Sequence, residues 1–270
     1  SGITLSSLAL IRINDTENEL NTSDVSNATF NITALFDITD PDGPSDVLVA
    51  EDSYDITWNK TGSGLNEVLL EYSTDNGNNW TNVNGTNGNV DNSLGSYTWN
   101  SVNGTVLSNN SLIRVSDPAK PSVNSTSAAA FPIRGKIILT APVNAAENWR
   151  VGTTHDITWD YQGNMTSVNI YYSADGGSNW TKINPSPVTC SNGNYSWTVN
   201  GTPSSNAKIS VNHTANEANV FSNSTAAFKV SSLMVTLPDT GTETWKVGSS
   251  YNITWIAANI SNVNVKYSAT

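Results

Sequence analysis

The chain has 270 residues, of which 13% are charged, and 12 basic against 23 acidic residues give a net charge of −11 at neutral pH. This balance excludes nucleic acid and anionic membrane surfaces as ordinary partners, because both attract cation-rich proteins. Hydrophobic residues make up 37% of the chain and include nine tryptophans, which suffices for thin β-sheet cores and argues against disorder. No apolar stretch reaches the ~18 residues of a membrane span, so none is predicted in this chain.

Asparagine is unusually frequent, with 38 residues, and eighteen of them begin an Asn-x-Ser/Thr glycosylation acceptor. Chance would supply roughly ten acceptors if about a quarter of the residues are Ser or Thr. A single cysteine, Cys190, excludes an intrachain disulfide. Together these features favour a secreted, archaeal surface glycoprotein over an extracellular eukaryotic domain. The predicted glycosylation sites are Asn14, Asn21, Asn27, Asn31, Asn59, Asn79, Asn84, Asn103, Asn109, Asn124, Asn164, Asn179, Asn194, Asn200, Asn212, Asn223, Asn252 and Asn259.

Internal repeats divide the chain. The tripeptide Ile-Thr-Trp ends at Trp58, Trp159 and Trp255, at spacings of 101 and 96 residues. A repeat position that stays apolar or aromatic is most simply a core position. The predicted parts are the end of one repeat at 1–34, complete repeats at 35–134 and 135–231, and the beginning of another at 232–270.

Phenylalanines mark where the repeats close. Phe131 and Phe228 lie 28 and 27 residues before the next Ile-Thr-Trp tryptophan, and Phe30 lies 28 residues before Trp58. Phe30 is therefore expected to close an earlier repeat. The constant spacing predicts junctions of a few residues and a stiff array.

Each repeat is predicted to consist of short β-strands. Val168, Ile170 and Tyr172 alternate with Asn169 and Tyr171, and a period of two residues is typical of a strand with one buried and one wet face. Turn signals recur every ~8–12 residues, and no helical periodicity extends over 11 residues. The fold class is therefore all-β: tandem immunoglobulin-like or fibronectin-like β-sandwiches with a repeat of about 97 residues.

Acidic residues crowd the beginning of the first complete repeat, among them Asp37, Asp40, Asp42 and Asp46. The segment Asp-Pro-Asp-Gly resembles a fragment of a calcium-binding loop, because oxygen ligands at alternate positions with a glycine turn suit Ca²⁺. No complete twelve-residue loop follows, and the equivalent residues of the next repeat are apolar. A solvated acidic junction is favoured over a calcium-stiffened hinge, and the sequence suggests no cofactor other than calcium.

The pattern Ser-x-Asp-x-Gly-x-x-Trp occurs twice, 100 residues apart, and resembles the Asp-box of sialidases. The resemblance implies that the aspartate holds a hairpin turn and that the tryptophan packs beneath it. Propeller blades repeat every ~40–50 residues, so this spacing does not indicate a sialidase propeller. The predicted structural residues are Trp58, Trp159, Trp255, Asp75, Asp175, Trp80 and Trp180.

The segment Trp-Arg-Val-Gly at 149–152, followed by Ile-Thr-Trp at 157–159, is echoed by Trp-Lys-Val-Gly at 245–248. It resembles the opening of the Ig-like module in the Ser/Thr-rich, glycosyl-phosphatidylinositol-anchored cell-wall family of fungi, and similar modules in repetitive surface proteins of bacteria and archaea. The first complete repeat departs from the pattern, because Glu51 stands in the place of Gly152. The resemblance implies a structural or adhesive role at the cell surface and no catalytic residues.

No catalytic set is evident. His155, His213 and Cys190 are scattered, and no zinc set, thiol dyad or nucleophile elbow is present. We therefore expect no enzymatic activity. Tyr161 and Tyr171 do not recur between repeats and are candidates for exposed contacts.

These observations predict an N-glycosylated structural subunit or segment of an extracellular cell-surface polymer, such as a surface layer, sheath or filamentous appendage, which self-associates head-to-tail. The alternative is an adhesin or glycan-binding stalk, and a weaker third class is a non-catalytic module of an extracellular hydrolase. Both ends are incomplete repeats, which indicates either a slice of a longer repetitive protein or strand exchange between subunits. The slice is favoured, because the two ends together still lack the Asp-box hairpin.

Overall fold

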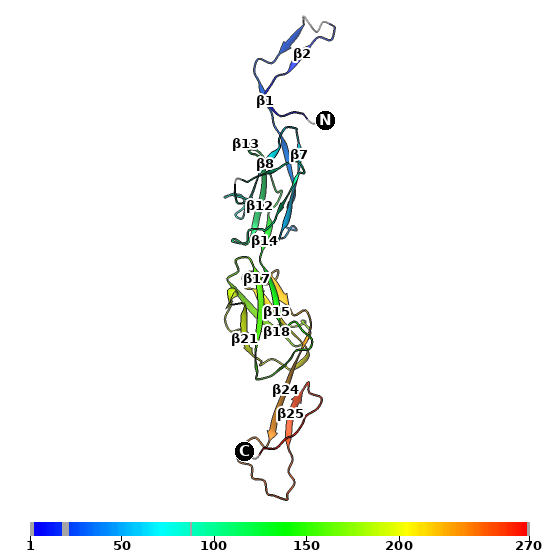
Figure 1. Ribbon diagram of the computed structural model, residues 1–270, viewed down its shortest axis with the longest axis vertical. Helices are drawn as coiled ribbons and strands as arrows, with labels where there is room; N and C mark the ends of the chain where they lie inside the picture. The colour runs from blue at the N-terminus through cyan, green and yellow to red at the C-terminus, as the bar shows by residue number, and fades with distance from the viewer. Residues whose placement is uncertain (1–2, 18–21, 87, 269–270) are drawn as a thin grey trace. The chain divides into compact units, whose positions relative to one another are not determined.

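The computed structural model describes residues 3–17, 22–86 and 88–268, and these residues form strands with one short 3-10 turn, η1 (Cys190–Asn192) (Figure 1). The chain consists of two compact units, Ser1–Arg134 and Gly135–Thr270, and each contains a β-sandwich. The predicted fold class, all-β with tandem immunoglobulin-like or fibronectin-like sandwiches, is confirmed. Within the described residues, no helix is long and apolar enough to cross a membrane.

The first unit begins with two antiparallel pairs, β1 (Ser6–Ala9) with β4 (Phe30–Ile32) and β2 (Arg12–Asn14) with β3 (Ser23–Val25). One sheet of its sandwich has the order β11-β7-β5, and the other has the order β10-β8-β12-β14-β6, with β13 on β12 and β9 on β8. Their bounds are β5 (Leu35–Asp40), β6 (Leu48–Val49), β7 (Tyr54–Thr61), β8 (Glu67–Ser73), β9 (Thr81–Asn82), β10 (Asn89–Asp91), β11 (Ser96–Trp99), β12 (Ser108–Asp117), β13 (Lys120–Thr126) and β14 (Phe131–Arg134).

The second unit repeats this topology, with β15-β17-β21 in one sheet and β16-β24-β22-β18-β19 in the other. Strands β20 and β23 join β18 and β22, and β25 pairs with β24. Their bounds are β15 (Lys136–Ala141), β16 (Asn148–Arg150), β17 (Thr154–Gln162), β18 (Ser167–Ser173), β19 (Thr181–Lys182), β20 (Val188–Thr189), β21 (Asn194–Thr198), β22 (Ser204–His213), β23 (Phe221–Asn223), β24 (Phe228–Leu237) and β25 (Thr254–Ala258).

The Ile-Thr-Trp strands β7 and β17 carry the centre of each core. Trp58 and Trp159 are 3% and 2% exposed. A buried indole N–H needs an acceptor, and Trp58 Nε1 donates to Asn92 Oδ1 at 2.9 Å, while Trp159 Nε1 donates to the Cys190 carbonyl at 3.0 Å. The inward residues of this tripeptide are thus buried and satisfied in both complete repeats.

Strand β24 belongs to two structures at once. Its first residues pair with β22 and with the parallel strand β16 inside the sandwich, and the residues from Ser232 onward pair with β25 (Figure 1). The hydroxyls of Thr236 and Thr254 lie 2.7 Å apart, as do those of Thr140 and Thr158 in the sandwich. The β24–β25 hairpin therefore has the same register as the β15–β17 pair of the sandwich.

Candidate functional site

The two Asp-box turns have the same hydrogen bonds. In the second unit, Ser173 Oγ donates to Asp175 Oδ1 at 2.7 Å and accepts the Gly177 N–H at 2.8 Å. The Asn179 N–H donates to Asp175 Oδ1 at 2.8 Å, and Asn179 Nδ2 donates to Asp175 Oδ2 at 2.6 Å. Hydrogen bonds to a carboxylate favour its charged form, so the bonds from Asn179 and then Ser173 lower the Asp175 pKa to about 2. The aspartate holds the turn between β18 and β19.

The first unit repeats this network around Asp75. Ser73 Oγ donates to Asp75 Oδ1 at 2.7 Å, and Asn79 Nδ2 donates to Asp75 Oδ2 at 2.6 Å. Bonds from Asn79 lower the Asp75 pKa to about 2. In both turns the amide nitrogen of an acceptor asparagine, the atom that would carry a glycan, is already engaged by a carboxylate.

The turn tryptophans are half-buried and lie against glycine. A Cβ added to Gly177 would be 3.3 Å from Trp180 Cζ2, and one added to Gly77 would be 3.5 Å from Trp80 Cζ2. Both glycines also have positive φ, which side chains rarely adopt. Trp80 and Trp180 thus pack against their turns and keep part of their surface toward solvent.

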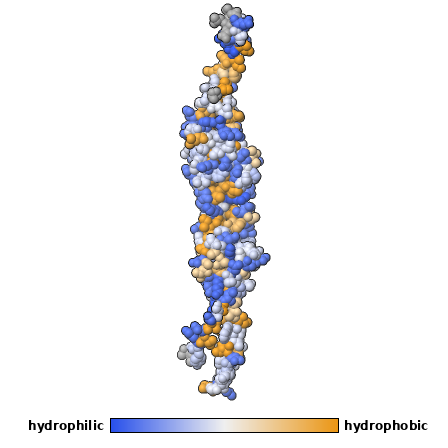
Figure 2. Space-filling view, turned by 90° about the vertical axis from the view of Figure 1, so that its right-hand side faces the viewer, coloured by the Kyte–Doolittle hydropathy of each residue, from blue (hydrophilic) through white to orange (hydrophobic). Residues whose placement is uncertain are grey.

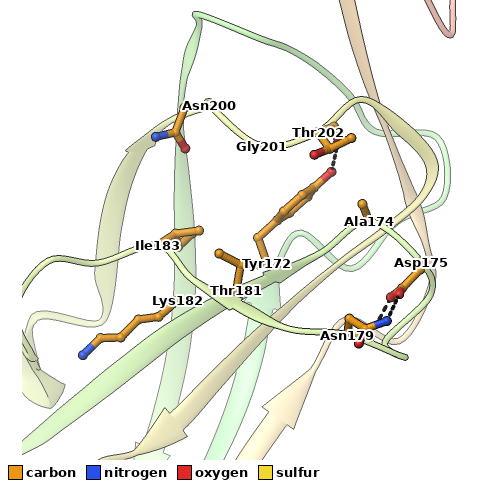
Figure 3. A pocket seen from close by; sticks show the side chains of 10 residues that line it. All are labelled: Tyr172, Ala174, Asp175, Asn179, Thr181, Lys182, Ile183, Asn200, Gly201 and Thr202. Atoms are coloured by element: carbon orange, nitrogen blue, oxygen red, sulfur yellow. Dashed lines mark hydrogen bonds between the residues drawn. The ribbon is translucent and has the colours of Figure 1, made fainter.

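A polar cavity of about 390 Å³ lies between the second Asp-box turn and the Asn-Gly-Thr loop after β21 (Figure 3). At its base, Tyr172 OH donates to the Thr202 carbonyl at 2.5 Å, and burial raises the Tyr172 pKa to about 12. Two acceptor asparagines, Asn179 and Asn200, line this cavity from different loops (Figure 3). The sequence predicts both acceptors, but only the fold brings them to one cavity.

The acceptor asparagines lie on accessible surface. Of the seventeen that the structure describes, thirteen are exposed, four are partly buried and none is buried. Asn21 lies outside the described residues. Eight of the seventeen lie on strands, where core residues take the other phase, and nine lie in turns or loops. The partly buried acceptors are Asn84, Asn103, Asn212 and Asn259.

The acidic segment of the first repeat uses its carboxylates inside the protein. Asp46 Oδ2 accepts the N–H groups of Asp42 and Gly43 at 2.8 and 2.9 Å. Asp40 Oδ1 accepts the Tyr54 hydroxyl at 2.6 Å, and burial together with Asp40 raises the Tyr54 pKa above its usual range.

The remaining member, Asp37, is exposed on β5 opposite Asn59. Across the described ranges, no group of three or more His, Cys, Asp or Glu is arranged to hold a metal ion. The hydrogen-bonding roles of these carboxylates favour the acidic junction, and calcium binding stays a prediction.

The β24–β25 hairpin exposes the residues that form the core elsewhere. Trp255 is 41% exposed and Ile253 is 40% exposed, whereas Trp159 and Ile157 are 2% and 0% exposed. Trp255 is therefore not a core residue, contrary to the prediction, because among the described residues no second sheet packs on the β24–β25 pair. With Leu233, Val235, Trp245 and others they line an apolar cavity of about 360 Å³, and Figure 2 shows apolar surface at this end of the chain.

The chain segment that includes this hairpin nevertheless has the same aromatic stacking as the second sandwich. Trp245 stacks on Tyr251 with ring centroids 4.9 Å apart and planes at 1°, as Trp149 stacks on His155 at 4.6 Å and 6°. At the other terminal segment, Phe30 is 40% exposed although the equivalent phenylalanine of the complete repeat is fully buried. Side chains whose equivalents are buried in the two sandwiches are thus exposed in both terminal segments.

No family model matches this chain, and no curated protein matches it. Among solved structures, it is similar to three N-terminal domains of the Hoc outer capsid protein of bacteriophage RB49, with 12% identity, a TM-score of 0.27, and coverage of 82% of this chain and 78% of that one. It is also similar to the four N-terminal Ig domains of Dscam1 isoform 6.44, with 8% identity and a TM-score of 0.31, covering 82% of this chain and 53% of that one. For the FN1–FN3 domains of chicken CNTN1 the identity is 13% and the TM-score 0.27, with 72% and 60% covered.

Proposed function

We propose that this chain is a structural segment of an N-glycosylated extracellular polymer at the cell surface, such as a surface layer, sheath or filamentous appendage. The observation that supports this most is the hairpin of residues 232–258. It repeats the register and stacking of a complete sandwich, yet Ile253 and Trp255 are 40% and 41% exposed. An exposed apolar face of this kind marks an interaction site.

Strands of a further repeat are the proposed occupant of this face. In the complete repeats the equivalent face is covered by the second sheet of the same sandwich. The first residues of the chain carry this kind of strand, because Ile11 and Arg12 match Ile113 and Arg114 at an offset of 102, whereas Leu5 packs against the first sandwich. Repeats of neighbouring subunits would then join head-to-tail, and the joined sandwich would lack the Asp-box turn, because neither end of the chain contains that motif.

The surface supports a glycan coat. Seventeen described acceptors are at least partly exposed and occur on both units. The net charge of −11 is a separate property, and it keeps the protein surface poor in cations. The adhesin or glycan-binding stalk remains a second candidate function, because an aromatic cavity lies beside Trp180.

Assembly of the full chain tests the polymer. Sedimentation velocity over a range of concentrations, followed by negative-stain microscopy, is expected to show ordered oligomers. Trp255→Glu should prevent their formation, since a charge would enter the apolar face. Ile138→Glu is the matched control, because Ile138 is 42% exposed on a complete sandwich. Monomers at every concentration, or assembly unaffected by Trp255→Glu, would contradict the proposal.

The glycan coat and the calcium hinge have separate tests. Glycopeptide mass spectrometry of protein from a glycosylating host should find occupied acceptors. Finding none of the eighteen acceptors occupied would contradict the proposed glycan coat.

The calcium hinge is tested by thermal unfolding, because a ligand that binds the folded state raises the unfolding midpoint. An unfolding midpoint that excess EDTA leaves unchanged would contradict a stabilising calcium ion at Asp37, Asp40, Asp42 and Asp46.

A further inference from the structure

A second cavity, of about 370 Å³, lies on the outer face of the β18–β22–β23 sheet. Its aromatic lining is Tyr171, Trp180 and Phe221, and Phe221 is 48% exposed. Its size falls within the ~300–1,000 Å³ of small-molecule sites. The aromatic side chains come from β18, from the end of the Asp-box turn and from β23, so no single sequence segment contains them.

The same position of the first sandwich is filled. There the Arg114 guanidinium lies over the Trp80 ring at 4.1 Å, and Arg114 Nη2 is 2.6 Å from Glu71 Oε2. Glu71 and Arg114 are paired across β8 and β12. In the second sandwich the corresponding cross-strand pair is Tyr171 and Ser210. Replacing the ion pair by tyrosine and serine removes the guanidinium from the tryptophan face and leaves an open cavity beside it.

Polar groups are fixed at the edge of this cavity. Tyr171 OH donates to Glu217 Oε2 at 2.8 Å, and Asn169 Nδ2 donates to Glu217 Oε1 at 2.5 Å. A carboxylate has about four lone-pair sites, so two of them remain for a ligand. Ser210 Oγ donates to Asn212 Oδ1, which leaves the Asn212 amide hydrogens for an acceptor. The site therefore offers both acceptors and donors around aromatic rings.

We propose that this cavity binds a neutral pyranose ring. The C–H face of a pyranose packs on an aromatic ring, whose π-face is electron-rich, while its hydroxyl groups donate to Glu217 and accept from Asn212. The only charged group among the lining residues is the Glu217 carboxylate, which disfavours an anionic sugar. Sugar binding at this cavity rests on the second candidate function, the glycan-binding stalk, and does not require polymer formation.

The sugar has two conceivable sources with the same chemistry. Asn212 and Asn223 are glycosylation acceptors and line this cavity. A sugar of the chain's own N-glycan can therefore occupy the site, or a saccharide of another molecule can enter it. Binding measured with and without N-glycosylation separates these sources.

The first arm uses the full chain made in a host without N-glycosylation, with ¹⁵N-labelled tryptophan. Methyl glycosides of glucose, galactose, mannose, N-acetylglucosamine and N-acetylgalactosamine are titrated while the indole N–H resonances are recorded. The Trp180 resonance, assigned with Trp180→Phe, is expected to shift saturably with at least one sugar, whereas the Trp80 resonance stays in place. The Trp80 site serves as an internal control, because Arg114 covers its ring.

The matched variant transplants the ion pair of the first sandwich. Tyr171→Glu with Ser210→Arg is expected to weaken sugar binding at least tenfold while the unit stays folded, since the first sandwich accommodates this pair. Phe221→Ala removes an exposed ring without touching the core, and it should weaken binding with an unchanged unfolding midpoint.

The second arm uses the chain from a glycosylating host, with occupancy measured by glycopeptide mass spectrometry. If the chain's own glycan occupies the cavity, Asn223→Gln or Asn212→Gln shifts the Trp180 resonance, and added methyl glycosides bind only after that glycan is removed. If the ligand is external, the glycosylated wild type binds it directly. The proposal is overturned if neither added sugar nor glycan removal moves Trp180, if Trp80 responds equally, or if the ion-pair variant binds as well as wild type.

Discussion

Two isoleucines of the repeated Ile-Thr-Trp motif test how tertiary packing changes the contribution of the same motif to the free energy of unfolding. Ile157 is 0% exposed inside a complete sandwich, and Ile253 is 40% exposed on the β24–β25 hairpin. Each is changed to alanine in the full chain. The local sequence is the same in both, so a difference in the free energy of unfolding reports the surrounding structure.

The expected magnitudes follow from burial. Alanine removes three carbons, and at about 0.8 kcal/mol per buried CH₂ the transfer term for Ile157 is about 2.4 kcal/mol. The cavity left in a closed core adds to it, so Ile157→Ala should cost about 3–4 kcal/mol, within the range of such substitutions. Ile253 is already 40% exposed and lines a cavity that is open to solvent, so Ile253→Ala should cost less than about 1.5 kcal/mol.

Urea unfolding followed by tryptophan fluorescence and circular dichroism measures both variants. The first unit is the internal reference, and Ile56→Ala is the matched control, because Ile56 is also 0% exposed and should shift only the transition of the first unit. Equal losses for Ile157→Ala and Ile253→Ala in the monomeric protein would refute the argument that the hairpin is an uncovered core. In assembled material, Ile253→Ala should weaken the association.

Three further substitutions test other features. Glu51 has φ +68° where Gly152 has φ +87°, so Glu51→Gly should stabilise the first unit by about 0.5–1 kcal/mol in urea unfolding, and a loss of stability would contradict the strain. The Asp175 pKa is lowered to about 2, so the stability that its charged form contributes is complete above the unfolded-state pKa of about 4 and is lost as the pH falls toward 2. Asp175→Asn should therefore flatten this part of a plot of melting temperature against pH. An unchanged plot would show that Asp175 does not contribute to acid unfolding. A Cβ on Gly201 would lie 2.6 Å from the buried Tyr172 ring, so Gly201→Ala should cost about 1–3 kcal/mol in urea unfolding, and a neutral result would show that this ring can move.

Local patterns in the sequence were sufficient for several features. The Asp-box networks join residues within one short turn, so a motif such as Ser173 to Asn179 contains its own hydrogen-bond partners. The alternation of β18 similarly placed Ile170 in the core without knowledge of what covers it. The fold class followed from this alternation together with the repeat length of about 97 residues, which is typical of a β-sandwich domain.

Other features depend on residues that are distant in sequence. Trp80 and Trp180 occupy the same motif, but Arg114 covers the first ring, and Ser210 leaves the second beside a cavity. The carboxylate of Asp40 resembles a calcium ligand in sequence, yet Tyr54 from another strand occupies its Oδ1. A motif by itself does not contain these partners.

The sequence by itself determined the repeated motifs, the all-β class, the inward phase of the strands that carry Ile170 and Trp159, and the positions of the glycosylation acceptors. Only the tertiary structure decided which inward residues are covered. Ile157 and Ile253 share a motif but differ in exposure, because strand alternation is a property of neighbouring residues, whereas burial requires a second sheet supplied from elsewhere.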